Sequence, residues 1–250
     1  MAVVYNLSVS TPSPSYVAFG DAMSVDLYPE SDVRERLGHA EAGLGAASLL
    51  FRNVDSMWPE FTGKDLRTRS PELQLQNLTS DGAMIETVRD QLRGVAGPET
   101  VSIVTLTIGG IDLIDALGLV ASGPDAKLRE SAHIRHRFTE LVGHLRAALP
   151  NARLILTTIY DPTDGTGLLW STQAPIPIDL LSEMNDHIRA TAHATRGAVL
   201  ADVDLHFRGH GIHADEAEPW YWRHSVIEPS ARGASEIRRT FWNALETTRG

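Results

Sequence analysis

The sequence contains no cysteine. This absence excludes disulfide bonds, thiolate metal sites and cysteine nucleophiles. Long hydrophobic runs are also missing, because no stretch approaches the roughly 18 apolar residues of a membrane-spanning helix. Residues 1–15, which we interpret as an N-terminal extension, have neither the basic start nor the apolar core of a signal peptide. These absences predict a soluble, cytoplasmic protein that does not enter a membrane.

Basic side chains are outnumbered, with 22 lysine and arginine residues against 32 aspartate and glutamate residues and a net charge of −10. Affinity for nucleic acids comes mainly from lysine and arginine contacts to phosphate. The acidic balance therefore argues against a nucleic-acid partner, and it also disfavours binding to anionic membrane surfaces.

Apolar residues make up 42% of the 250 residues, which suffices for the core of one α/β domain spanning residues 1–250. Five short β-rich runs stand out, and the last three are nearly continuous apolar stretches. Strands with that pattern are buried on both faces, as in a parallel sheet covered by helices. The predicted strands are residues 16–21, 73–79, 101–110, 152–161 and 197–204.

Between the strands, apolar residues recur at helical spacing, which predicts helices over residues 84–92, 134–149, 181–188 and 237–245. Alternation of strands and helices is typical of a doubly wound parallel sheet. Such sheets place their sites at the carboxyl ends of the strands. Two long insertions, residues 31–71 and 205–228, are expected to form lids or pocket walls there. The first contains a short apolar helix candidate, Ala46–Phe51.

Four motifs follow the predicted strands in order. They read Phe19-Gly20-Asp21-Ala22-Met23-Ser24, Asn77-Leu78-Thr79-Ser80-Asp81-Gly82-Ala83, Gly109-Gly110-Ile111-Asp112-Leu113 and Ile227-Glu228-Pro229-Ser230-Ala231-Arg232-Gly233. Their order, spacing and position resemble the GDSL/SGNH hydrolase family of esterases and acylhydrolases over most of the chain. The resemblance implies a three-layer α/β/α sandwich of the flavodoxin-like type, with five parallel strands in the spatial order 2-1-3-4-5.

The resemblance also implies a mechanism. In this family a serine in a Gly-Asp-Ser turn attacks an ester carbonyl, and a histidine in a late Asp-x-x-His-Pro segment is the base. The oxyanion is held by the serine amide, by a glycine amide after the second strand and by an asparagine side chain. No cofactor or metal is implied.

This sequence departs from the family pattern at most of those positions. Ala22 stands at the nucleophile position and Ile111 at the asparagine position. Glu228 stands at the histidine position and Ser225 at the aspartate position. The oxyanion glycine, Gly82, matches the pattern, as do two flanking residues, Asp21 and Asp112.

Loss of the serine alone costs roughly 10⁶ in turnover. Loss of one oxyanion donor costs about 10²–10³ more. We therefore expect the usual serine mechanism to be closed. Ser24 is the alternative nucleophile, but its position at the start of a helix points its hydroxyl elsewhere.

Two residues in the last loop are candidates for a base. Glu228 acts on water if burial raises its pKa, whereas a solvated glutamate, or one paired with Arg223 or Arg232, has only a structural role. His224 is the candidate for a relocated imidazole.

Other residues near the predicted site have both a structural and a functional interpretation. His206, His210 and His213 form either a weak metal set or loop hydrogen bonds. Trp220, Tyr221 and Trp222 either line a ligand pocket or pack the loop, and Asp161 either closes a turn or lines the site. Trp58 and Trp170 are candidates for the same pocket mouth.

Three interpretations of function follow. We favour a diverged or repurposed member that binds or acts on a small acylated or apolar ligand. The alternatives are an enzyme whose machinery lies elsewhere in the crevice, using His224, Glu228 or Asp21, and an active ester hydrolase with a deliberate serine-to-alanine change. Ile111 argues against the last of these, because a knockout requires only one substitution.

Overall fold

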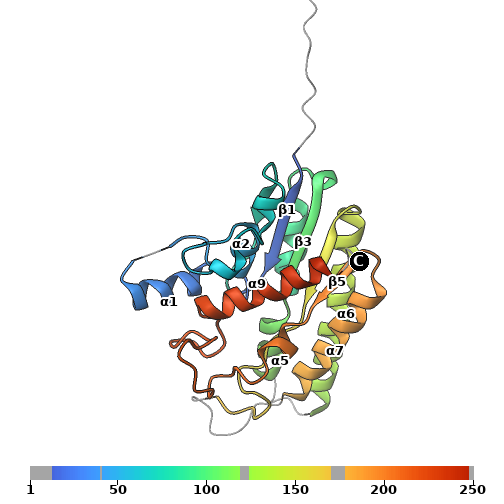
Figure 1. Ribbon diagram of the computed structural model, residues 1–250. Helices are drawn as coiled ribbons and strands as arrows, with labels where there is room; N and C mark the ends of the chain where they lie inside the picture. Colours follow the sequence, from blue (N-terminus) through green and yellow to red (C-terminus); the bar gives the residue numbers. More distant parts are fainter. Residues whose placement is uncertain (1–12, 40, 119–123, 170–177, 248–250) are drawn as a thin grey trace, which may run out of the picture.

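The computed structural model describes residues 13–39, 41–118, 124–169 and 178–247 (Figure 1). Its centre is a five-stranded, all-parallel sheet in the order β2-β1-β3-β4-β5. The predicted topology is therefore confirmed. The strands are β1 (Ser15–Gly20), β2 (Gln74–Asn77), β3 (Val101–Thr107), β4 (Arg153–Thr157) and β5 (Ala198–Ala201).

Helices cover both faces of the sheet, giving the predicted α/β/α layers. On one face α9 crosses the strands and contacts α1, α2 and α8, while on the other α6 contacts α4, α5 and α7 (Figure 1). The helices are α1 (Leu27–Leu37), α2 (Ala46–Phe51), α3 (Leu66–Arg69), α4 (Ile85–Gln91), α5 (Gly110–Gly118), α6 (Pro124–Ala148), α7 (Asp179–Ala194), α8 (Val203–Phe207) and α9 (Ala231–Glu246). Short 3₁₀ turns occupy Pro59–Phe61, Leu92–Gly94 and Pro98–Thr100. Among the helices of the described part, none has the length and hydropathy needed to cross a membrane.

Several strands end earlier than the apolar runs predicted. β3 stops at Thr107 because α5 already begins at Gly110. β5 stops at Ala201 because Asp202 turns the chain into α8, its side chain accepting a hydrogen bond from the Leu205 amide. The polar residues at the ends of these runs therefore belong to the turns, where they are available to a site.

The turn after β1 is fixed by close contact with β3. The Asp21 amide donates to the Thr107 carbonyl at 2.9 Å. A Cβ on Gly20 would lie 2.0 Å from Thr107 Oγ1, so this position requires glycine. Ser24 is fully buried, and its hydroxyl accepts a hydrogen bond from Thr107 Oγ1 at 2.9 Å. Ser24 thus secures the turn and is not presented as a nucleophile.

The first insertion supports α9, which corrects our expectation that residues 31–71 wall the site. Its helix α2 has the predicted bounds and contacts α9. Trp58, expected near the pocket mouth, is buried in a second apolar cluster with Phe61 and Ala234. Beneath this cluster the fully buried Arg238 donates to Asn53 Oδ1 at 2.8 Å. The insertion therefore anchors the helix that follows the last loop.

Candidate active site

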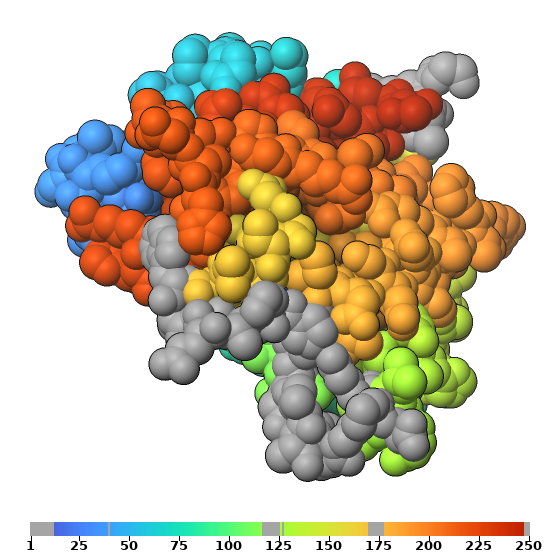
Figure 2. Space-filling view, turned by 90° about the horizontal axis from the view of Figure 1, so that it is seen from below, coloured from blue at the N-terminus to red at the C-terminus, as the bar shows by residue number. Residues whose placement is uncertain are grey.

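A cavity of about 360 Å³ lies at the carboxyl ends of β1, β3 and β4. Figure 2 views the molecule from this end, where the segment after β4 (yellow) lies against the loop before α9 (orange). The Ile212 amide joins these segments by donating to the Pro162 carbonyl at 2.8 Å. The wall is made of five pieces: the turn after β1, the start of α5, the segment after β4, the start of α7 and the end of the last loop.

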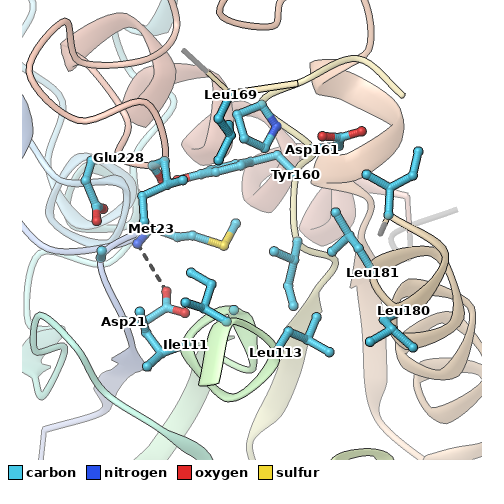
Figure 3. A pocket seen from close by; sticks show the side chains of 17 residues that line it. Asp21, Met23, Ile111, Leu113, Tyr160, Asp161, Leu169, Leu180, Leu181 and Glu228 are labelled. Carbon is cyan, nitrogen blue, oxygen red and sulfur yellow. Dashed lines mark hydrogen bonds between the residues drawn. The ribbon is translucent and has the colours of Figure 1, made fainter. Parts of the chain in front are cut away.

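The family places its nucleophile, its oxyanion glycine, its oxyanion asparagine and its base at four positions, and three of these meet in this cavity. Ala22, Ile111 and Glu228 all line it, together with Asp21 (Figure 3). Gly82 does not, although its φ of 68° places it in the tight turn after β2. The predicted crevice is therefore assembled from distant parts of the chain, with the glycine outside the lining.

Asp21 is buried, with 3% of its surface exposed. Its Oδ1 accepts a hydrogen bond from the Met23 amide at 3.1 Å (Figure 3). Burial, opposed by backbone hydrogen bonds and assisted by the charges of Asp112 and Asp81, raises the pKa of this carboxyl to about 7. The surroundings of Asp21 therefore favour its protonated form.

Asp112 has a structural role on the side away from the cavity. Its Oδ2 accepts from the Ile85 amide at 3.1 Å, and its Oδ1 lies 3.3 Å from Arg137 Nη2. These contacts tie α5 to α4 and α6. Burial raises the pKa of Asp112, while the hydrogen bond and the arginine oppose that change. Asp112 thus positions Ile111 without lining the cavity itself.

Glu228 is neither solvated nor paired with an arginine. It is 6% exposed, and its Oε2 is buried without a hydrogen-bond partner among the described residues. Arg223 pairs instead with Glu35 at 3.1 Å, and Arg232 pairs with Glu236 at 3.0 Å. Both structural interpretations of Glu228 offered by the sequence are therefore wrong.

The surroundings of Glu228 disfavour its charged form. Burial, together with the negative charges of Asp81 and Asp21, raises its pKa to about 7. Its backbone is held by a tight turn, in which the Glu228 amide donates to the Ser225 carbonyl and the Trp222 amide donates to the Glu228 carbonyl. The backbone at Glu228 is thus fixed, and no described residue forms an ion pair with its carboxyl group.

His224 is not brought to the cavity, so its proposed role as a relocated base needs correction. It is exposed, and its Nε2 lies 3.1 Å from Glu35 Oε2 on α1. Although only four positions separate it from Glu228 in sequence, the turn between them sends the two side chains to different surroundings. The imidazole belongs to a surface ion-pair group with Arg223.

The aromatic cluster packs the last loop and does not line the cavity, which corrects the ligand-binding prediction for it. Trp220 stacks on His210, with ring centroids 3.7 Å apart. Tyr221 contacts the ring of Tyr160 edge-on at 5.1 Å, and Trp222 lies 5.5 Å from Tyr28. Trp170 lies outside the described residues.

The three histidines after β5 have separate partners. His206 pairs with Glu236, His210 with Glu216, and His213 with the Leu168 carbonyl. In the part of the chain that the structure describes, no three histidine, aspartate or glutamate side chains are grouped to hold a metal ion. The interpretation of loop hydrogen bonding therefore fits these contacts.

Sequence reasoning missed most of the apolar wall. Leu180 and Leu181 at the start of α7, with Ile159 and Tyr160 after β4, complete the cavity. The Tyr160 hydroxyl donates to the Ile227 carbonyl at 2.7 Å, which joins this wall to the last loop. Asp161 both lines the cavity and caps its own turn through Thr163 and Gly165. Tyr160 and Asp161 close the fourth apolar run, so the position rule for parallel sheets offered a signal for this wall.

Comparison with known proteins assigns the scaffold. The sequence profile of the GDSL-like Lipase/Acylhydrolase family matches residues 41–235. A search of curated proteins finds no match. Among solved structures, a lipase from a goat rumen metagenome is 16% identical with a TM-score of 0.60, over 93% of this chain and 97% of that one.

Two further structures have similar folds. An extracellular lipase from Streptomyces rimosus is 19% identical with a TM-score of 0.55, over 94% of this chain and 99% of that one. A variant acetyl xylan esterase from Geobacillus stearothermophilus is 14% identical with a TM-score of 0.58, over 93% of this chain and 94% of that one. The profile match covers most of the chain, and the chain therefore belongs to the GDSL-like lipase/acylhydrolase family.

Proposed function

We propose that this protein is a diverged member of its family that binds a small apolar or acylated ligand and does not carry out serine-based acyl transfer. One observation carries the proposal: the cavity is intact, but Ala22 and Ile111 stand where the family places a nucleophile and an oxyanion donor. Among the described lining residues, the one hydroxyl belongs to Tyr160, which donates to the Ile227 carbonyl.

The composition of the lining supports ligand binding without the chemistry. Aliphatic side chains from α5, from α7 and from the segment after β4, with the ring of Tyr160, form most of the wall, and a few carboxyl groups provide the polar contacts. Ligand sites in proteins generally have this composition, with a few polar groups setting orientation. The related structures include lipases and an acetyl xylan esterase, which supports an acylated ligand class for this chain.

A second function is favoured by the raised pKa of Glu228. A carboxyl group that titrates near pH 7 suits general-base catalysis on water. In that case, slow ester hydrolysis would rise as pH increases through about 7 and would disappear in Glu228→Gln. Ile111 still removes one oxyanion donor, so we place ligand binding first.

Two assays test the proposal. Short p-nitrophenyl esters should not be hydrolysed above the rate in water, and a fluorophosphonate probe should not label residues 22 or 24. Calorimetric titration with decan-1-ol should show binding with a negative heat-capacity change, the mark of apolar burial. Leu181→Trp, which fills the cavity, should abolish the binding, whereas the matched Leu128→Trp on the exposed face of α6 should not.

Covalent labelling at Ser24, shown by peptide mass mapping, would overturn the non-catalytic part of the proposal. Equal decan-1-ol binding by wild type and Leu181→Trp would overturn the binding part, because the ligand would then lie elsewhere on the molecule.

A further inference from the structure

The cavity has a strongly one-sided charge. Its lining contains three carboxyl groups, from Asp21, Asp161 and Glu228, and no lysine, arginine or histidine among the described residues. An anionic ligand placed there would meet like charge in surroundings that screen it poorly. A free carboxylate or a phosphate therefore fits this site badly.

The acidic groups are also unevenly placed within the cavity. Figure 3 shows Asp21 and Glu228 at one end, beside Met23, with Leu180 and Leu181 at the opposite end. Both carboxyl groups line the same cavity, and the negative charge of Asp21 contributes to the raised pKa of Glu228. We name the end with Asp21 and Glu228 the acidic end, and the end with Leu180 and Leu181 the aliphatic end. A ligand that matches both is an amphiphile.

The acidic end has an unmet hydrogen-bonding requirement. Glu228 Oε2 is buried and has no partner among the described residues, and a buried acceptor left unpaired is costly. Asp161 differs, because its two oxygens accept hydrogen bonds from Thr163 and Gly165 in its own turn. The group that a ligand can satisfy is therefore at the acidic end.

The basic side chains that are close to Glu228 in sequence are already engaged. Arg223 and His224 pair with Glu35, and Arg232 pairs with Glu236. No described side chain of the lining thus neutralises the acidic end, and a cation from outside is the complementary group.

We propose that the cavity selects an amphiphile with a cationic head, of the alkylammonium class, whose head lies between Asp21 and Glu228 and whose chain lies along Leu180 and Leu181. This inference rests on the proposed ligand-binding function and names its ligand class. An ammonium group supplies three donors and a positive charge, whereas an alcohol supplies one donor and a fatty acid supplies an anion.

The proposal implies a particular pH dependence. Glu228 faces Asp21, Asp81 and the hydroxyl groups of Tyr28 and Tyr160, none of which is cationic. Asp21 faces Asp81 and Asp112. Both carboxyl groups titrate at about 7, so they are charged above that pH and neutral below it. A primary amine remains protonated throughout, as lysine does with its pKa near 10.4. The preference for the amine should therefore be strongest above about pH 7.

Three ligands of equal chain length test the charge selection: decylamine, decan-1-ol and decanoate, titrated calorimetrically below their aggregation concentrations. At about pH 8 decylamine should bind about tenfold more tightly than decan-1-ol, as a charge-assisted hydrogen bond allows. Decanoate should bind most weakly. At about pH 5.5 the advantage of decylamine over decanoate should fall by about tenfold or more.

Proton release gives a second measurement on the unmodified protein. Binding of a cation favours the charged carboxylates, so decylamine should release protons near pH 7. Decan-1-ol should release none. Titrations in two buffers with different ionisation enthalpies measure this difference directly.

Glu228→Gln keeps the shape of the side chain and removes its charge. It should lower the ratio of decylamine affinity to decan-1-ol affinity about tenfold. Glu86→Gln, on the exposed face of α4, makes the same change in net charge and should alter neither affinity. If Glu228→Gln fails to fold, the pH series and the proton release on wild type still decide the question.

The outcomes separate this inference from the proposed function. Binding of decan-1-ol with equal or tighter binding of decanoate would overturn the cationic selection and leave the ligand-binding function standing. Failure of all three ligands to bind would overturn both. Decylamine binding that is insensitive to pH, and that is weakened equally by Glu86→Gln, would show non-specific attraction to an acidic protein and would also overturn the inference.

Discussion

Two buried glutamates flank the start of α9 and have opposite electrostatic surroundings. Glu228 is 6% exposed and Glu236 is 2% exposed. Burial raises the pKa of both, but for Glu236 the hydrogen bonds from His206 and Arg239, with the charges of Arg239 and Arg232, reverse that effect and lower the pKa to about 2. The charges that act on Glu228 are those of Asp81 and Asp21, which are negative, and its pKa rises to about 7.

The comparison shows how a structural carboxylate differs from one that is available to a ligand. Glu236 is held by His206 Nε2 and Arg239 Nε, each at 2.8 Å, and it joins α8 to α9. Its charge is thereby used within the fold. Glu228 lies at a cavity wall with one oxygen unpartnered among the described residues, although Arg223 and Arg232 are close to it in sequence. The fold leaves this carboxyl group unneutralised, and this underlies our assignment of it to a ligand.

The largest expected effect is a gain of esterase activity when the family's catalytic residues are restored together at positions 22, 111, 225 and 228. Ala22→Ser alone should leave esterase activity close to that of wild type, because Glu228 replaces the imidazole and Ile111 replaces an oxyanion donor. The combined variant Ala22→Ser, Ile111→Asn, Glu228→His and Ser225→Asp should exceed the single variant by about 10³-fold or more on the same acetyl ester. Residues 225 and 228 are joined by a tight turn, which brings the new aspartate near the new histidine.

The matched control for that experiment is the same combined variant with Ala22 retained, which should be inactive. High activity in Ala22→Ser alone would show that a base other than residue 228 reaches position 22. It would also favour the interpretation of a deliberate knockout.

A smaller effect is expected from Glu236→Gln, which leaves two arginines and a histidine without their carboxylate partner. We expect a loss of about 3 kcal/mol in the free energy of unfolding at neutral pH, at the lower end for a broken buried ion pair because the arginines reach solvent. The folded-state pKa is depressed, so this stability is present above about pH 4.5 and is lost as pH falls towards about 2. Denaturant unfolding of both proteins across that range measures it, and an equal difference at all pH values would contradict it.

Glu228→Gln should change the free energy of unfolding in the opposite direction. The folded-state pKa is raised, so the stability from Glu228 is fully present below about pH 4.5 and is lost as pH rises through about 7. At about pH 8 the variant should therefore be more stable than wild type, by about 2 kcal/mol, and at about pH 4 the two should be equal. Thermal unfolding at both pH values tests this expectation. Destabilisation at pH 8 would show that the carboxylate has a partner in solution.

The scaffold was predictable from sequence because its signals are local. The apolar runs marked the strands, and the motifs after β1, β3 and before α9 placed Ala22, Ile111 and Glu228 at one edge. The lack of an arginine partner for Glu228 was not predictable in this way. Arg223 and Arg232 are its neighbours in sequence, but they pair with Glu35 and Glu236, which other elements bring into contact with them.

The same reason explains the errors over the aromatic residues. Trp220, Tyr221 and Trp222 are adjacent in sequence, yet they contact His210, Tyr160 and Tyr28 respectively, because neighbouring residues of an extended loop point in different directions. The insertion at residues 31–71 was expected at the site because of its length. Its apolar residues instead pack against α9. Length and residue type identified both segments but did not indicate which face they cover.

The smallest effect is expected at His224, the sequence neighbour of Glu228 that the fold sends to the surface. His224→Ala removes an exposed contact to Glu35, which also pairs with Arg223. Such surface pairs contribute little, so the free energy of unfolding should change by less than about 0.5 kcal/mol. Decylamine affinity should stay within about twofold, because the imidazole does not line the cavity and Glu228 does. Titration of wild type and His224→Ala under the same conditions as Glu228→Gln makes the comparison direct. A loss of affinity in His224→Ala as large as that in Glu228→Gln would mean that the last loop rearranges when ligand binds, and it would return His224 to the site.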